Sequence, residues 1–126
     1  MSRFLFAAAA LAMTVMPGVA LAHTKLLSSD PAANAIVAKP TKLTLGFSEK
    51  FLAPMSGVEL TMTGMPGMAN HASMPIKGFK ISVAADGKTM IVTLPRALPA
   101  GTYDLKWHVV GADQHKMEGG YSFTVK

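Results

Sequence analysis

The chain has 126 residues, with 12 Lys and Arg against 7 Asp and Glu, and half of its residues are hydrophobic. It contains no cysteine, which excludes a disulfide framework and a thiolate metal site. The basic residues are scattered singly, without the aromatic–basic interleaving that is typical of nucleic-acid binding, so we expect no nucleic-acid partner.

The first 22 residues predict a secretory signal peptide. Arg3 gives a positive start, an apolar run covers residues 4–15, and Pro17 breaks it before the small-residue sequence Ala20-Leu21-Ala22. The alternative is an uncleaved membrane anchor, but the apolar run is short for a span and is followed by proline. We therefore expect cleavage after Ala22 and a single mature domain, residues 23–126, that does not span the membrane.

The mature part is predicted to be all-β. Apolar and polar residues alternate with the period of half-buried strands, and helical signals are nearly absent. Asp86-Gly87 is a typical hairpin turn. The predicted strands cover residues 25–29, 43–47, 58–62, 79–83, 90–94, 103–109 and 121–125. About seven short strands indicate a β-sandwich or a small Greek-key barrel.

Residues 62–74 concentrate four methionines, Met62, Met65, Met68 and Met74, around His71. Glycine and proline in this segment predict an exposed loop, although Met62 shares the parity of the preceding strand and can point into the core. Thioether sulfur is a soft ligand that favours Cu(I), and an imidazole could complete a low-coordinate site. The alternative is an adaptable apolar contact with a partner.

Cleavage after Ala22 would make His23 the amino terminus, whose amine and imidazole together can chelate Cu(II). A terminal amine ordinarily has a pKa of about 7.7–8.0, so binding should weaken in acid. Asp113 and His115 lie two residues apart and would face the same side of an extended segment. Carboxylate oxygen and imidazole nitrogen suit tetragonal Cu(II).

Three further residues carry weaker signals. Glu49 continues the inward parity of the strand that ends near Phe47, and a carboxylate at the edge of a core needs a cation or hydrogen-bond donors. A lysine ion pair or simple exposure would explain Glu49 equally well. His108 should face outward, because Trp107 has core parity, and Met117 is expected to pack rather than to bind metal.

Together these residues resemble the periplasmic copper-resistance family of CopC and PcoC. The resemblance covers essentially the whole mature part. It is carried by His23, Phe47-Ser48-Glu49, the run Met-Thr-Gly-Met-Pro-Gly-Met at residues 62–68 with His71 and Met74, the run Leu-Pro-Ala-Gly-Thr-Tyr at residues 98–103, Trp107, and Asp113 with His115.

The resemblance implies a Greek-key barrel of cupredoxin-like or immunoglobulin-like shape with two copper sites at opposite ends. The Cu(II) site would use His23, Asp113 and His115, with Glu49 near or at the metal. The Cu(I) site would draw on a subset of Met62, Met65, Met68, His71 and Met74. Family members are regarded as periplasmic carriers or buffers that pass copper to other periplasmic or inner-membrane proteins.

The sequence departs from the family pattern at three places. Thr24 stands where proline is common, which we expect to loosen the terminus. His108 replaces a common arginine, and the run Gly-Ala-Asp-Gln-His at residues 111–115 replaces one closer to Ser-Ser-Asp-Thr-His while keeping Asp113 and His115.

Two other classes of function remain as alternatives to a binding protein without enzymatic activity. A terminal histidine chelate also resembles lytic polysaccharide monooxygenases, but this chain has only one Trp and two Tyr for a carbohydrate surface. A sandwich interaction domain with incidental histidines would leave the methionine cluster unexplained. A blue-copper electron carrier is excluded, since that site needs a cysteine.

Overall fold

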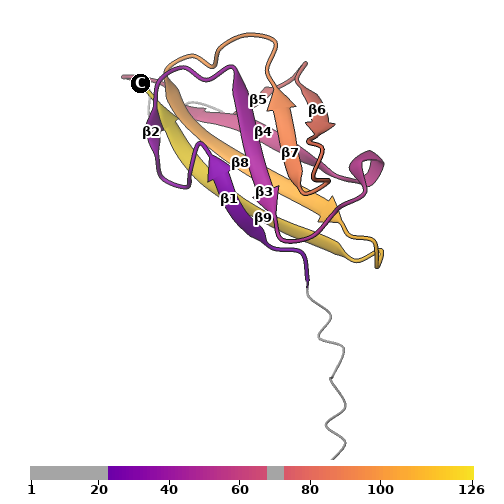
Figure 1. Ribbon diagram of the computed structural model, residues 1–126. Helices are drawn as coiled ribbons and strands as arrows, with labels where there is room; N and C mark the ends of the chain where they lie inside the picture. The colour runs from indigo at the N-terminus through magenta and orange to yellow at the C-terminus, as the bar shows by residue number, and fades with distance from the viewer. Residues whose placement is uncertain (1–22, 68–72) are drawn as a thin grey trace, which may run out of the picture.

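The computed structural model describes residues 23–67 and 73–126 (Figure 1). This part of the chain forms nine strands and one short 3₁₀ helix, η1, at Ala53–Met55. None of its helices is long and apolar enough to cross a bilayer. The strands are β1 (Leu26–Asp30), β2 (Ile36–Val37), β3 (Lys42–Phe47), β4 (Gly57–Gly64), β5 (Met74–Ile76), β6 (Lys80–Val83), β7 (Thr89–Thr93), β8 (Gly101–Val110) and β9 (Lys116–Val125).

The strands form two sheets that face each other as a sandwich (Figure 1). One sheet has the order β1-β3-β7-β6, and the other has the order β2-β9-β8-β4-β5. All pairs are antiparallel except β2 with β9. The predicted all-β sandwich is confirmed, with nine strands rather than seven. The two additional strands, β2 and β5, have two and three residues, too few to display an alternation in the sequence.

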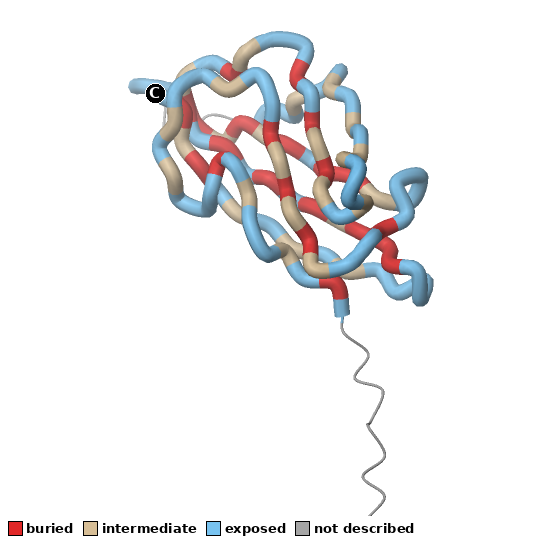
Figure 2. Tube along the Cα trace, viewed as in Figure 1, coloured by how far each residue is buried: buried red, intermediate tan, exposed pale blue. Residues whose placement is uncertain are grey.

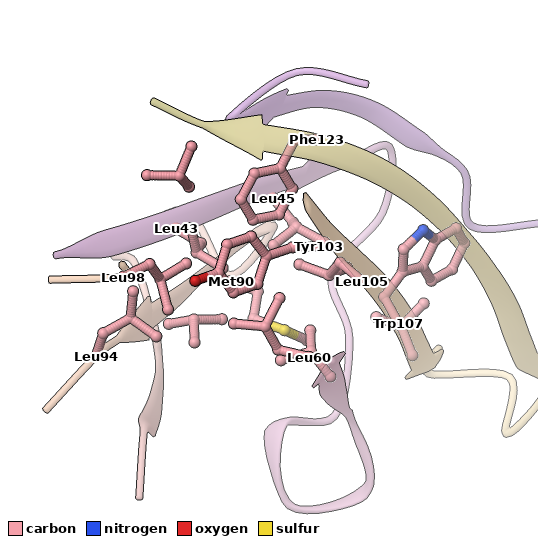
Figure 3. Close-up of a cluster of buried hydrophobic side chains, with 14 of the residues drawn as sticks. Leu43, Leu45, Leu60, Met90, Leu94, Leu98, Tyr103, Leu105, Trp107 and Phe123 are labelled. Atoms are coloured by element: carbon pink, nitrogen blue, oxygen red, sulfur yellow. The ribbon is translucent and has the colours of Figure 1, made fainter. Parts of the chain in front are cut away.

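The core lies between the two layers. Along β8, buried and exposed residues alternate as the period of a strand requires (Figure 2). Tyr103 and Phe123 stack with their ring centroids 5.4 Å apart, and Phe47 meets Trp107 edge-on at 5.2 Å. The Tyr103 hydroxyl donates to the Pro99 carbonyl at 2.6 Å, and burial raises the pKa of Tyr103 to about 12. Aromatic and aliphatic side chains from both sheets therefore meet in one core (Figure 3).

The predicted hairpin turn at Asp86-Gly87 is confirmed between β6 and β7. Gly87 has a φ of +70°, which glycine adopts without strain. The Asp86 carboxylate accepts hydrogen bonds from the backbone N–H groups of Lys88 and Thr89 at 2.9 and 3.0 Å. Those bonds hold the pKa of Asp86 below its ordinary value and fix the register of this hairpin.

The long β8–β9 hairpin separates the two ends of the sandwich. Its strands pair from Gly101 opposite Val125 to Val110 opposite Lys116. The β8–β9 turn and the C-terminus therefore lie at opposite ends of the molecule (Figure 1). A ten-residue strand spans about 30 Å. The residues that directly precede β8 and those that directly follow it therefore lie at opposite ends of the sandwich.

Candidate metal centres

Asp113 and His115 meet in the turn between β8 and β9. The segment is not extended as predicted, because the Gln114 N–H donates to the Gly111 carbonyl at 2.9 Å and Gln114 has a φ of +66°. Asp113 Oδ1 accepts from the His115 backbone N–H at 3.1 Å. Asp113 Oδ2 lies 3.1 Å from His115 Nδ1. The turn, rather than strand parity, brings the two side chains together.

These contacts set the electrostatics of the turn. The pKa of Asp113 lies below its ordinary value, first because its carboxylate accepts the His115 backbone N–H and then because of the charge of His115. The carboxylate occupies Nδ1 of His115, which leaves Nε2 as the free ring nitrogen. Both side chains remain accessible, with exposed fractions of 39% for Asp113 and 57% for His115. A ligand can therefore reach them from solvent.

His23 lies beside this turn. Its ring centroid is 6.2 Å from that of His115, with an angle of 45° between the ring planes. Thr24, expected to loosen this segment, is instead buried with only 6% of its surface exposed. Lys25 and Ser48 exchange two hydrogen bonds. The contacts of Thr24 and Lys25 were not predicted, because partners so far apart in sequence give no local signal.

Of the expectations for Glu49, an inward carboxylate is not met and simple exposure is confirmed. Strand β3 ends at Phe47, and the chain bends as Ser48 turns to pair with Lys25, so Glu49 is exposed. Within residues 23–67 and 73–126, no three His, Asp or Glu side chains converge closely enough to hold a metal ion. The structure therefore brings His23 and Asp113 each next to His115, without a complete coordination shell.

His108 and Met117 lie as predicted. His108 faces outward from β8, opposite Glu118 of β9, and both line a shallow groove on the outer face of the five-stranded sheet. A hydrogen bond from Lys116 is the main reason that the pKa of Glu118 is lowered. Met117 is partly buried and packs against the core. Among the described residues, His108 does not join His23, Asp113 and His115 in a group of three or more possible metal donors.

The methionine segment begins at the end of the sandwich opposite the β8–β9 turn, where Met62 pairs with Tyr103. Met62 is in the core, with 3% of its surface exposed, and pairs with Met74 across β4 and β5. Met65 and Met74 are exposed, at 40% and 52%. The predicted ligands Met68 and His71 lie outside the described residues. Two of the predicted thioethers are thus accessible at one end, and Met62 is covered.

A CopC domain family model matches residues 26–126. The chain belongs to the CopC family. Copper resistance protein C of Escherichia coli is 47% identical to this CopC-family chain over 107 residues, covering 85% of the chain and 84% of the relative. Copper resistance protein C of Xanthomonas campestris pv. juglandis is 48% identical over 108 residues, covering 85% and 83%.

Solved structures agree with this assignment. The crystal structure of PcoC, a methionine-rich copper resistance protein from Escherichia coli, matches this CopC-family chain with a TM-score of 0.75 at 45% identity, covering 83% of this chain and all of that one. CopC from Methylosinus trichosporium OB3b shares the fold, with a TM-score of 0.65 at 24% identity and coverage of 82% and 94%. The resemblance inferred from the motifs is therefore confirmed.

Proposed function

We propose that this CopC-family chain is an exported copper carrier or buffer without enzymatic activity of its own. In this proposal the leader is removed after Ala22, and residues 23–126 hold copper in the periplasm and pass it to other periplasmic or inner-membrane proteins. The observation that carries the proposal is the approach of His23 to His115 at one end of the sandwich, 6.2 Å between ring centroids, in a chain whose relatives are named copper resistance protein C.

The end with His23 suits Cu(II). An amine, two imidazoles and a carboxylate are the nitrogen and oxygen donors that this ion prefers. His23 would supply its amine and ring, His115 its Nε2 atom, and Asp113 an oxygen after a small rotation away from His115. Glu49 is exposed one residue beyond Ser48, which pairs with Lys25, so it could add negative charge near the ion.

The methionine end suits Cu(I). The exposed thioethers of Met65 and Met74 can bind a soft cation without any change in the core, and Met68 and His71 would complete the set. Met62 was a candidate for the same site. Its burial in the core supports a packing role, so we place it outside the minimal set of ligands.

Paired variants test the assignment of the two ions to the two ends. On protein that starts at His23, replacing Met65 and Met68 by Leu should weaken Cu(I) binding and leave Cu(II) binding unchanged. His115→Ala should do the reverse, because it removes only the ring beside His23. Competition against chromophoric chelators of each oxidation state measures both affinities. Equal damage to both ions by either change would contradict the proposal.

A further inference from the structure

The backbone that follows His23 is held by the end of β3. The Lys25 N–H donates to Ser48 Oγ at 2.9 Å, and the Ser48 N–H donates back to the Lys25 carbonyl at 2.8 Å. Ser48 is the first residue beyond β3, so this pair extends the β1–β3 ladder toward the terminus. The four-stranded sheet therefore supplies one attachment for the segment that carries His23.

The five-stranded sheet supplies the second attachment. Thr24 is buried, and its Oγ1 lies 3.3 Å from the place that a Cβ atom would take on Gly111. The same Cβ position is 3.0 Å from Asp113 Oδ1. Gly111 follows directly after β8 and itself bridges to Phe51. The missing side chain at Gly111 thus lets Thr24 and the Asp113 carboxylate pack closely on the same backbone.

These two attachments close one open end of the sandwich with the first residues of the mature chain. A chain terminus is ordinarily mobile unless it is tied down, and fixing it on binding would cost conformational entropy. Here residues 24 and 25 are already ordered against both sheets, so the ring of His23 stays near His115 before any ion arrives. Pre-ordered donors bind more tightly than donors that the ion must collect.

We infer that Thr24, Ser48 and Gly111 are positioning residues for the Cu(II) site, and we call them the terminal clamp. None of them is proposed to touch the metal. The clamp acts by holding the backbone that carries His23 on one side, and the backbone that carries Asp113 on the other, close to His115. This inference rests on the proposed function, since it assigns Cu(II) to the end that carries His23.

Gly111→Ala is the sharpest change. The added methyl group must displace Thr24, Asp113 or both by a few tenths of an ångström, against the two contacts that hold Asp113 to His115. Residues that orient metal ligands typically cost 10- to 100-fold in affinity when changed, so we expect Cu(II) affinity to fall about 10-fold or more. Cu(I) affinity should change less than about twofold, because the methionine end lies about 30 Å away.

Two substitutions of Thr24 compare the loss of its packed side chain with the loss of its hydroxyl alone. Thr24→Gly removes the packed side chain and should weaken Cu(II) binding to a similar degree, whereas Thr24→Val keeps the β-branched shape and should restore it to within about twofold. Val92→Ala is the matched control for lost stability, since Val92 is fully buried in β7, where it pairs with Leu43 and Ile81 rather than with Thr24, Ser48 or Gly111. It should lower the unfolding midpoint without changing the Cu(II) affinity.

Two readouts separate positioning from general damage. The Cu(II) electron paramagnetic resonance spectrum should change in Gly111→Ala and not in Val92→Ala. In the metal-free protein, Ser48→Ala should speed hydrogen exchange at the Lys25 amide, and Gly111→Ala should speed it at the His115 amide, which donates to Asp113.

A double variant tests the crowding at Gly111. The loss of Cu(II) binding free energy in the combined Gly111→Ala and Thr24→Ala protein should be smaller than the sum of the two single losses, because removal of the Thr24 hydroxyl relieves part of the crowding.

The outcomes distinguish the two proposals. If wild-type protein that starts at His23 binds no Cu(II), the proposed function fails, and the assignment of the clamp to that ion fails with it. If wild type binds Cu(II) but Gly111→Ala and Thr24→Gly bind it as wild type does, or lose only as much as Val92→Ala, the clamp is overturned and the function stands. Unchanged amide exchange in the metal-free variants would also overturn the clamp.

Discussion

Thr24 and Gly111 show how single residues shape the end of the sandwich that carries His23. Both stand where the sequence departs from the family pattern, and the structure places the Thr24 hydroxyl beside Gly111, 3.3 Å from where a Cβ atom would lie. They gave separate signals in the sequence, and the burial of Thr24 argues against the expected loosening of the terminus. Donor chemistry, which is local, predicted His23, Asp113 and His115 as Cu(II) ligands. The bend at Ser48, which decides that Glu49 is exposed rather than inward, could not be predicted, because strand alternation carries no information on where a strand ends.

The direction in which acid changes the stability that Asp113 contributes can be predicted. Its pKa lies below the ordinary value of 3.8, so its contribution to stability is present above that value and is lost as the pH falls through the lowered pKa. Asp113→Asn should therefore lower the urea unfolding midpoint of the metal-free protein at pH 6, and the difference from wild type should vanish at the lowest pH at which both still fold. Urea titrations from pH 6 downward measure this.

The matched control is Glu59→Gln, which alters an exposed carboxylate on the outer face of β4. Its midpoint should follow that of wild type across the same range. A difference between Asp113→Asn and wild type that stayed constant down to the lowest pH would show that the carboxylate contributes through packing rather than through its charge.

Strands β4 and β5 show what the pattern of a single element can and cannot predict. The alternation in β4 correctly placed Met62 on the buried side with Val58 and Leu60. The three-residue strand β5 was not predicted, so neither was the pairing of Met74 with Met62. In an antiparallel pair, directly opposite residues lie on the same face of the sheet, and Met74 stays exposed because β5 is the edge strand.

This pairing predicts different roles for two neighbouring methionines. Met62→Ala should destabilise the fold by about 2–5 kcal/mol, the usual cost of truncating a buried methionine, whereas Met74→Ala should cost little. For copper the order should reverse: Met74→Leu should weaken Cu(I) binding, and Met62→Leu should leave it within about twofold. Urea unfolding and a Cu(I) competition assay measure the two effects. A larger loss of Cu(I) affinity in Met62→Leu than in Met74→Leu would return Met62 to the ligand set.

At the scale of the whole molecule, the β8–β9 hairpin keeps the two candidate sites apart. Cations of charge +2 and +1 about 30 Å apart in water interact by only about 0.3 kcal/mol before salt screening, so the sites should fill independently.

The all-β class and the family could be predicted from the sequence, because strand periodicity and spaced motifs are local features. The closing of one end by residues 24 and 25 could not, since it depends on contacts between both sheets.

The most direct test of the central claim is a titration of residues 23–126, with the terminus verified as His23, by Cu(II) and Cu(I) in either order. We expect one ion of each kind per chain, with neither displacing the other. A matched protein with one alanine before His23 should lose most of its Cu(II) affinity, because the amine of His23 becomes an amide, and should keep its Cu(I) affinity. Displacement of one ion by the other, or Cu(II) binding that the extra residue leaves unchanged, would contradict the account.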